Sequence, residues 1–217
     1  MRPFGLGDFL FIVGAVRFTL GLSALAFLGG AAGGAVVALA RVSQSRALRG
    51  IAITYIRVFQ GTPLLLQLFL VFFGADMLGA PLGPWLSAAL GLSLNAAAFL
   101  GEIWRGALEA VPAGQHEAAR ALGLSYAPRM LRVVAPQALR VAVAPTVGFL
   151  VNLVKSTSLA AVIGFVELTR AGQLVNNATF RPFAVFGTVA ALYFLLCWPL
   201  SLASRALERR LALATRR

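Results

Sequence analysis

Long apolar stretches without a charged residue dominate the pattern along the chain. Residues 18–40, 77–101 and 182–204 form uncharged runs of 23, 25 and 23 residues. Each run exceeds the roughly 18–20 residues that a helix needs to cross a bilayer. Two further apolar stretches contain isolated polar groups. We therefore predict an all-α polytopic membrane protein that forms a single transmembrane domain over residues 1–217, with five transmembrane helices at about 16–40, 52–74, 84–104, 137–155 (continuing irregularly to 166) and 183–204.

Composition supports this interpretation and removes several classes of protein. The chain is 59% hydrophobic and 12% charged, with a mean hydropathy of +0.85, whereas soluble domains have about 45–50% apolar and about 25% charged residues. A soluble enzyme and a disordered chain are therefore excluded. Cys197 is the only cysteine, which excludes a disulfide-stapled domain. His116 is the only histidine, so imidazole and thiol ligands are scarce and no metal site is expected.

The first expected span is rich in small residues. Its glycines would let the backbone of another helix approach closely; they are Gly21, Gly29, Gly30, Gly33 and Gly34. A secretory signal peptide is the alternative, but its apolar core would be about 7–15 residues long. The run here is longer and has no clear cleavage site, so we expect a retained membrane anchor.

Polar side chains inside the other expected spans are candidates for a transport pathway. The second span contains Gln60, Thr62 and Gln67, which need partners inside the protein because lipid offers none. The third span ends in Glu102, which we expect to be the only carboxylate lying against a span. Glu102 either belongs to the pathway or pairs with Arg105 at i+3.

Lys155 is the most specific of these candidates. It is the only lysine among 19 basic residues, and it stands in an apolar stretch where a charge is costly. A compact ammonium suits the carboxylate of a substrate, with Asn152, Thr157 and Ser158 as neutral partners beside it. The alternative is that Lys155 extends its ammonium to the membrane interface.

Basic residues are distributed unevenly among the expected loops. Segments 41–50, 105–140 and 205–217 contain 13 of them, whereas the opposite side holds four. The positive-inside rule then places the long loop at 105–136 and the C-terminus in the cytoplasm, and the N-terminus outside. The net charge of +12 reflects this bias and an attraction to anionic membrane lipid rather than nucleic-acid binding.

The chain lacks recognisable catalytic and nucleotide-binding motifs. It has no G-x-S-x-G or H-E-x-x-H sequence and no closely spaced pair of carboxylates suited to acid–base chemistry. Lys155-Ser156-Thr157 ends like a phosphate-binding loop, but Phe149 and Val154 stand where that loop needs glycines. We therefore expect no enzyme activity, and uphill transport would need energy from a partner or an ion gradient.

The long loop contains one short helix with small residues at its centre. The sequence predicts that it begins near Gly114 or Gln115 and ends at Gly123, since glycine often follows the last turn of a helix. A helix this short is marginal alone in water. It either docks on a partner protein, which Ala118 and Ala119 would allow to approach closely, or packs only on its own protein.

The spacing within this loop resembles the cytoplasmic signature of the membrane subunits of bacterial ATP-driven (ABC) importers. That signature reads E-A-A, three residues, G, nine residues, I-x-L-P. Here Glu117-Ala118-Ala119 is followed at the same spacing by Gly123 and then by Val133-Val134-Ala135-Pro136. Val133 replaces Ile and Ala135 replaces Leu, and both changes keep an apolar side chain.

Further segments resemble the polar amino-acid branch, which includes histidine, glutamine and arginine importers. The resemblance covers about residues 15–210. Two positions depart from the pattern, because Gln60 stands where the family often has Arg, and Ser156 where it often has Asp. The matching segments are Gly61-Thr62-Pro63-Leu64-Leu65 with Gln67; Phe99, Glu102 and Arg105-Gly106 with Val111-Pro112-Ala113-Gly114-Gln115; and Lys155-Ser156-Thr157-Ser158-Leu159 with Ile163-Gly164.

The resemblance implies the type I ABC importer permease fold and a multi-pass permease of the bacterial inner membrane that imports a polar amino acid. It implies a second permease subunit, identical or related, and an extracytoplasmic amino-acid-binding protein. Two ATPase subunits would bind ATP and Mg²⁺, so no cofactor is expected in this chain. A gradient-driven amino-acid carrier or channel subunit is the alternative, which explains the buried polar residues but not the loop signature.

The resemblance also implies that the short helix is a coupling helix seated in a groove of the ATPase. Glu117 would either contact the ATPase or cap the helix, and we favour the cap because a carboxylate in the first turn is stabilised by free backbone N–H groups. The residues implied in coupling are Gly114, Gln115, Glu117, Ala118, Ala119, Leu122 and Gly123.

Overall fold

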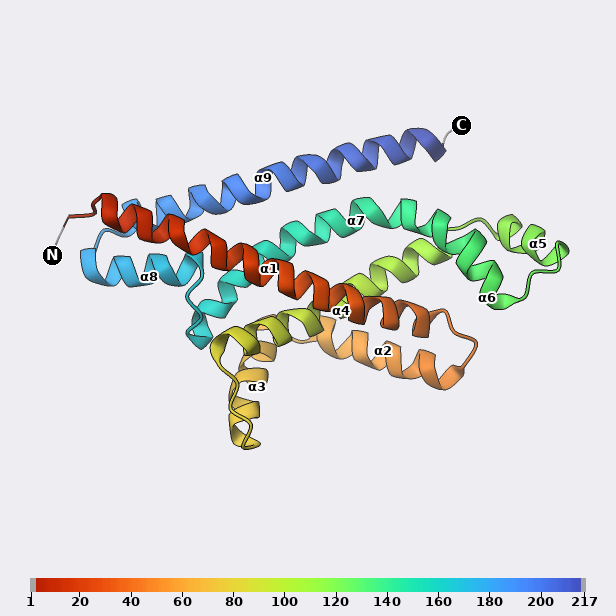
Figure 1. Cartoon of the computed structure of the whole chain (residues 1–217), viewed down its shortest axis with the longest axis horizontal. Coiled ribbons are helices and arrows are strands. Elements are labelled where there is room, and N and C mark those ends of the chain that lie inside the picture. The colour runs from red at the N-terminus through yellow and green to blue at the C-terminus, as the bar shows by residue number, and fades with distance from the viewer. Residues whose placement is uncertain (1–2, 216–217) are drawn as a thin grey trace.

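The structure is a computed structural model that describes residues 3–215, with side chains described through residue 209. Every regular element in this part of the chain is a helix (Figure 1). The α-helices are α1 (Leu6–Arg41), α2 (Arg46–Gly61), α3 (Leu64–Met77), α4 (Pro84–Glu109), α5 (Ala113–Ala121), α6 (Tyr126–Arg129), α7 (Ala135–Ser156), α8 (Leu168–Thr179) and α9 (Pro182–Thr215). A π-helical turn, Met130–Val134, precedes α7, and a 3₁₀ helix, Thr157–Ile163, follows it.

Four helical segments are long and apolar enough to cross a membrane: Leu6–Arg41, Pro84–Glu109, Tyr126–Ile163 and Pro182–Arg209. The helices α2 and α3 form a fifth segment if they are counted together, although they are bent by 104°. The expected continuous helix at 52–74 is therefore wrong. Pro63 has no N–H to donate and forces the preceding Thr62 into an extended conformation (φ −116°, ψ 144°), which ends α2.

Several other helices differ from their expected bounds. α1 begins at Leu6 rather than near residue 16, because the Asp8 carboxylate accepts a 3.1 Å hydrogen bond from the Gly5 N–H and closes the first turn. α8 occupies a segment for which no helix was expected. The end of the expected loop at 105–136 is also helical, because α6 and the π-helical turn lead directly into α7.

The close helix approach expected from the glycines of the first span occurs between α1 and α4. A Cβ atom on Gly30 would lie 2.4 Å from the Cβ of Ala96, and one on Gly33 would lie 2.9 Å from the Cβ of Ala97. Gly21 is different, because a Cβ there would make an ordinary 3.6 Å contact with Trp85. The backbone of α1 thus lies against α4 at distances that no side chain would permit.

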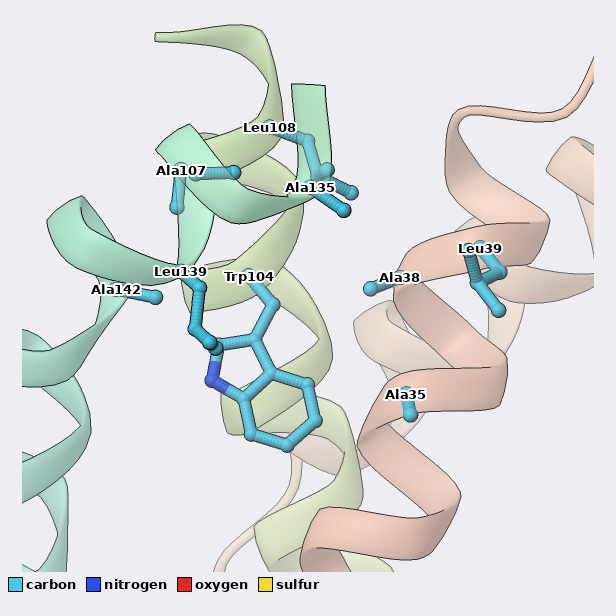
Figure 2. Close-up of a pocket in the computed structure, with 10 residues that line it drawn as sticks. Ala35, Ala38, Leu39, Trp104, Ala107, Leu108, Ala135, Leu139 and Ala142 are labelled. Carbon is cyan, nitrogen blue, oxygen red and sulfur yellow. The ribbon is translucent and has the colours of Figure 1, made fainter. Parts of the chain in front are cut away.

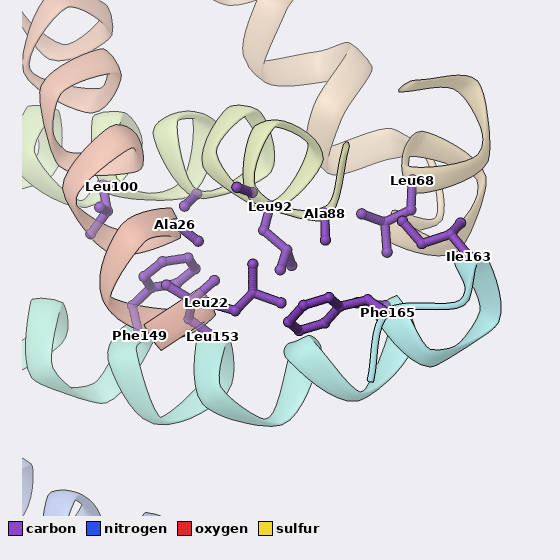
Figure 3. Packing of buried hydrophobic residues seen from close by; sticks show 13 residues of the cluster. Leu22, Ala26, Leu68, Ala88, Leu92, Leu100, Phe149, Leu153, Ile163 and Phe165 are labelled. Atoms are coloured by element: carbon purple, nitrogen blue, oxygen red, sulfur yellow. The ribbon is translucent and has the colours of Figure 1, made fainter. Parts of the chain in front are cut away.

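The main apolar core joins α1 and α4 to α3, α7 and the 3₁₀ helix. Figure 3 shows Leu22 and Leu92 facing Leu153 and Phe165, with Leu68 of α3 at one end. Leu22, Leu68 and Leu92 are fully buried. Because lipid chains are as apolar as these residues, the core is stabilised by close van der Waals packing rather than by exclusion of water.

The short helices lie together at one end of the molecule. In Figure 1, α5 and α6 extend beyond α4 and α7, on the same side as the α1–α2 turn and the C-terminal end of α9, while the N-terminus lies at the opposite end. The Tyr126 hydroxyl donates a 2.9 Å hydrogen bond to the Val42 carbonyl, which ties α6 to the end of α1. The arginine-rich segments of the sequence therefore gather at this end.

Candidate functional site

Helix α5 carries the loop signature and begins at Ala113, next to the expected start at Gly114 or Gln115. It ends where the sequence predicts, since Gly123 adopts the left-handed conformation with φ +76°. The N–H of Gly123 donates to the Arg120 carbonyl at 2.9 Å, and the N–H of Leu124 donates to the Ala119 carbonyl at 3.1 Å. These bonds satisfy carbonyls that the end of the helix leaves free.

The two central alanines of the signature face opposite ways. Ala119 is buried against the protein, whereas Ala118 is exposed. Leu122 is 81% exposed, and Gly114 and Glu117 are exposed as well. One side of α5 therefore packs against the rest of the chain (the held side), and the opposite side is exposed (the open side).

Glu117 does not cap α5, so the favoured interpretation of this residue is wrong. Because the helix begins at Ala113, Glu117 falls in its second turn, where the backbone N–H groups are already paired within the helix. Pro112, the residue directly before α5, makes no side-chain hydrogen bond that would cap the helix. The anchor at this end is instead Gln115, whose Oε1 accepts a 3.2 Å hydrogen bond from Nε2 of Gln137 on α7.

Gln67 is the centre of a polar network at the bend between α2 and α3. Its Nε2 donates to the Phe59 carbonyl at 2.8 Å, to the Thr62 carbonyl at 3.0 Å and to the Thr62 hydroxyl at 2.9 Å. Its Oε1 accepts a 3.0 Å bond from Nδ2 of Asn95 on α4. The Gln60 amide donates a longer 3.4 Å bond to the Ala98 carbonyl. The network thus supplies partners for backbone carbonyls that the broken helix leaves free.

Sequence reasoning missed Asn95. It stands within the longest uncharged run, 77–101, and was not among the candidate polar residues. The available signal was the same as for Gln67: an amide inside a span needs a partner, and a second amide can provide it.

Glu102 lies in an ion cluster at the end of α4 rather than beside the other candidate pathway residues. Its Oε1 accepts a 2.9 Å hydrogen bond from Nε of Arg105, so the i+3 pair is present. Arg105 also pairs with Glu109, and Nε of Arg41 lies 3.7 Å from Oε2 of Glu102. The cluster therefore joins the ends of α1 and α4.

Lys155 lies in the last turn of α7 with an exposed side chain, and within the described residues its ammonium makes no hydrogen bond or ion pair. The nearby hydroxyls bond the local backbone. Thr157 is fully buried and donates to the Val154 carbonyl at 2.7 Å, and Ser158 donates to the Lys155 carbonyl at 2.7 Å. Asn152 is exposed one turn before. Of these four residues, Lys155 and Asn152 have side chains free to meet a ligand.

Glu167 contradicts the expectation that Glu102 is the only carboxylate lying against a span. It is fully buried and caps α8, accepting 2.8 Å bonds from the N–H groups of Thr169 and Arg170. The Tyr193 hydroxyl of α9 donates to it at 2.7 Å. Burial raises the pKa of the Glu167 carboxyl, and these hydrogen bonds oppose the rise. The N–H of Leu168 donates to the Thr19 hydroxyl of α1, so this joint connects α1, α8 and α9.

The predicted pathway residues therefore form three separate groups in the structure. Gln60, Thr62 and Gln67 lie at the α2–α3 bend, Glu102 lies in the ion cluster, and the Asn152–Ser158 group lies at the end of α7. No hydrogen bond or ion pair among the described residues connects one group to another.

Comparison with known families and proteins shows what this chain is similar to. The family model described as "Binding-protein-dependent transport system inner membrane component" matches residues 18–213. The L-cystine transport system permease protein TcyB of Bacillus subtilis is 37% identical over 91% of this chain and 85% of its own. The glutamine transport system permease protein GlnP of Escherichia coli is 35% identical, with 93% of each chain covered.

Solved structures agree with the fold. A chain from the crystal structure of an amino acid ABC transporter with histidines superposes with a TM-score of 0.86 at 32% identity, covering 92% of this chain and 94% of that one. A chain of the inward-facing MetNI methionine ABC transporter gives a TM-score of 0.79 at 22% identity over 95% and 99% of the two chains. The all-α fold predicted from the sequence is thus confirmed as that of type I ABC importer permeases. The family match covers nearly the whole chain, including the surface helix with the loop signature, and this protein belongs to the family of inner membrane components of binding-protein-dependent transport systems.

Proposed function

We propose that this chain is a permease subunit of an ATP-driven importer for a polar amino acid. It would form half of the translocation pathway, beside an identical or related second permease. The names of the cystine and glutamine permeases that it resembles support the substrate class, as does the solved amino acid transporter. An extracytoplasmic binding protein would deliver the amino acid.

Coupling would take place at α5. Two ATPase subunits would bind ATP and Mg²⁺, and each permease would seat its α5 in a groove of one of them. The observation that carries this proposal is the division of α5 into a held side, with Ala119 buried, and an open side that presents Ala118 and Leu122. Closure of the ATPase pair would then tilt the spans as rigid bodies and alternate the access to the pathway.

The end of the molecule that carries α5 would face the cytoplasm, with the N-terminus outside. The count of 13 basic residues against four supports this orientation. Lys155 would offer its unpaired ammonium to the α-carboxylate of the amino acid, with the exposed Asn152 beside it. The polar groups at the α2–α3 bend would hold the shape of the pathway wall.

Cross-linking tests the coupling helix directly. Ala118→Cys in a Cys197→Ser background places a thiol on the open side of α5 and removes the natural one. A short bifunctional reagent should join this variant to the ATPase in membranes. Ala80→Cys, exposed in the α3–α4 loop, is the matched control and should not react with the ATPase. Active transport with no cross-link from residue 118 would contradict the proposal.

A further inference from the structure

A basic pocket lies between the end of α1, the start of α2 and the helices α5 and α6. Its volume is about 310 Å³, and Arg41, Arg49, Arg129, His116 and Tyr126 contribute to its lining. Nε of Arg129 is buried and has no hydrogen-bond partner among the described residues, and its guanidinium carbon lies 5.5 Å from the centre of the Tyr126 ring. The pocket therefore offers a buried donor without an acceptor.

Positive charge in this pocket exceeds the negative charge available to it. Glu109 is the one carboxylate in the lining, and it already pairs with Arg105. Arg41 is partly compensated by Glu102 at 3.7 Å, whereas Arg49 and Arg129 have no ion pair within the described part of the chain. An anion bound here would gain two uncompensated guanidinium groups, which suit phosphate oxygens geometrically.

An apolar groove of about 210 Å³ begins where the basic pocket ends, and Leu108 lines both. The groove runs between α1, α4 and α7. Figure 2 shows Ala38 of α1 opposite Ala107 and Ala142, with the Trp104 indole between the helices. Its floor consists of small buried residues, and its rims are Leu39 and Leu139, which are 60% and 68% exposed.

No polar side chain in the lining of the groove is free to form a hydrogen bond with water. Nε1 of Trp104 already donates a 3.0 Å hydrogen bond to the Thr146 hydroxyl. Ala135, where the signature of the family has leucine, contributes to the lining and leaves space beside Trp104. An apolar groove of this kind between helices long enough to cross a membrane accommodates a hydrocarbon chain better than water.

We propose that the basic pocket and the apolar groove together bind one anionic phospholipid, with its phosphate between Arg49 and Arg129 and an acyl chain along α1, α4 and α7. Basic pockets between membrane helices are a recognised way of binding acidic headgroups. A free phosphate would use the pocket and leave the groove empty, whereas the lipid uses both. The inference rests on the packing of α5 and α6 against the ends of α1 and α2, and it is independent of the substrate and of any docking to the ATPase.

Native mass spectrometry of the full chain, purified with its associated subunits, measures lipid binding without any transport assay. The complex is titrated with phosphatidylglycerol, with phosphatidylcholine of the same acyl chains, and with inorganic phosphate. We expect the anionic lipid to bind more tightly than the zwitterionic one. Arg49→Gln and Arg129→Gln should each weaken the anionic lipid about fivefold. Arg132→Gln, exposed nearby and outside the lining, is the matched control.

Ala135→Leu tests the groove separately from the charge. It restores the residue of the signature, so the fold tolerates it, and it should weaken both lipids about tenfold by displacing roughly two methylene groups. Arg129→Lys keeps the charge and should retain most of the binding. The proposal is overturned if both lipids bind alike and the arginine variants bind normally. It is also overturned if inorganic phosphate displaces the lipid fully while Ala135→Leu has no effect, which would identify a phosphate pocket.

Discussion

Asn95 on α4 donates a 3.0 Å hydrogen bond to Gln67 on α3, and this contact fastens the broken second membrane segment to the centre of the molecule. Gln67 in turn satisfies the carbonyls of Phe59 and Thr62. A sharp bend inside a membrane is tolerated only where the protein itself supplies such partners.

Gln67→Leu should therefore destabilise the protein by about 1–3 kcal/mol, because the Phe59 and Thr62 carbonyls and the Asn95 amide each lose a hydrogen bond inside the protein. Thermal unfolding in detergent measures the change. In a double-mutant cycle, Gln67→Leu and Asn95→Leu should be non-additive, since they share one bond. Thr188→Val, which removes an exposed hydroxyl bonded within its own helix, is the control. Strict additivity would show that the bond contributes nothing.

Gly30→Ala should destabilise the α1–α4 contact by about 1–3 kcal/mol, because its Cβ would overlap that of Ala96. Gly14→Ala is a matched control in the same helix, where a Cβ meets no atom within 4 Å. That control should be neutral or stabilising by up to about 1 kcal/mol. The measurement is again the unfolding temperature, and equal effects of the two variants would disprove the close approach.

Gly123→Val should reduce both substrate-stimulated ATP hydrolysis and uptake while leaving the spans inserted. A β-branched residue at φ +76° is strained by at least about 1–2 kcal/mol, so the end of α5 and its exposed Leu122 would shift. Uptake and substrate-stimulated ATP hydrolysis should fall together in proteoliposomes. Gly106→Ala, in open space on α4, should retain both activities. Normal uptake by Gly123→Val would refute the role of α5.

Lys155→Met should nearly abolish transport if the ammonium meets the α-carboxylate of the substrate, and Lys155→Arg should retain part of it. Losing one charge-assisted hydrogen bond costs about 1.5–3 kcal/mol, which is roughly ten- to a hundredfold in affinity. Uptake is measured at several substrate concentrations with the assembled complex quantified in parallel. If both variants transport normally at limiting substrate, Lys155 only reaches the membrane interface.

Reporter fusions test the orientation. A reporter after Gly79 should lie outside the cytoplasm, and one after Arg217 should lie in the cytoplasm, because the basic residues concentrate in the loops assigned to the inner side. Two reporters on the same side would overturn the arrangement of five spans.

The three uncharged runs were sufficient to predict the membrane helices α1, α4 and α9, because a bilayer admits few other structures for such segments. Gly123 was predictable too, since few residues other than glycine readily adopt its conformation. The pairing of Gln67 with Asn95 was not, because it depends on how α3 folds back along α4. The role of Glu167 was missed for a similar reason: Thr169 and Arg170 follow it closely, but Tyr193 is 26 residues away and meets it only because α9 packs beside α8.

Hydropathy could not predict the hydrogen bond that the Asp8 carboxylate accepts from the Gly5 N–H, nor the start of α1 at Leu6. Arg17 interrupts the apolar pattern close to the expected start at residue 16, and its guanidinium carbon lies 4.7 Å from the centre of the Phe18 ring, inside a helix that begins at Leu6. Apolar periodicity thus locates the middle of a helix well and its ends poorly, since the ends depend on individual hydrogen bonds.

The contacts around Glu167, which connect α1, α8 and α9, determine when native packing of this domain can be completed during synthesis. Thr19 leaves the ribosome first, Glu167 follows much later, and Tyr193 arrives only with the last membrane helix. Until α9 has inserted, the carboxylate has no partner beyond the first turn of α8. A nascent chain halted before α9 would hold α8 against α1 while the buried carboxylate still lacked one of its three hydrogen bonds, so native packing here follows the insertion of the last helix.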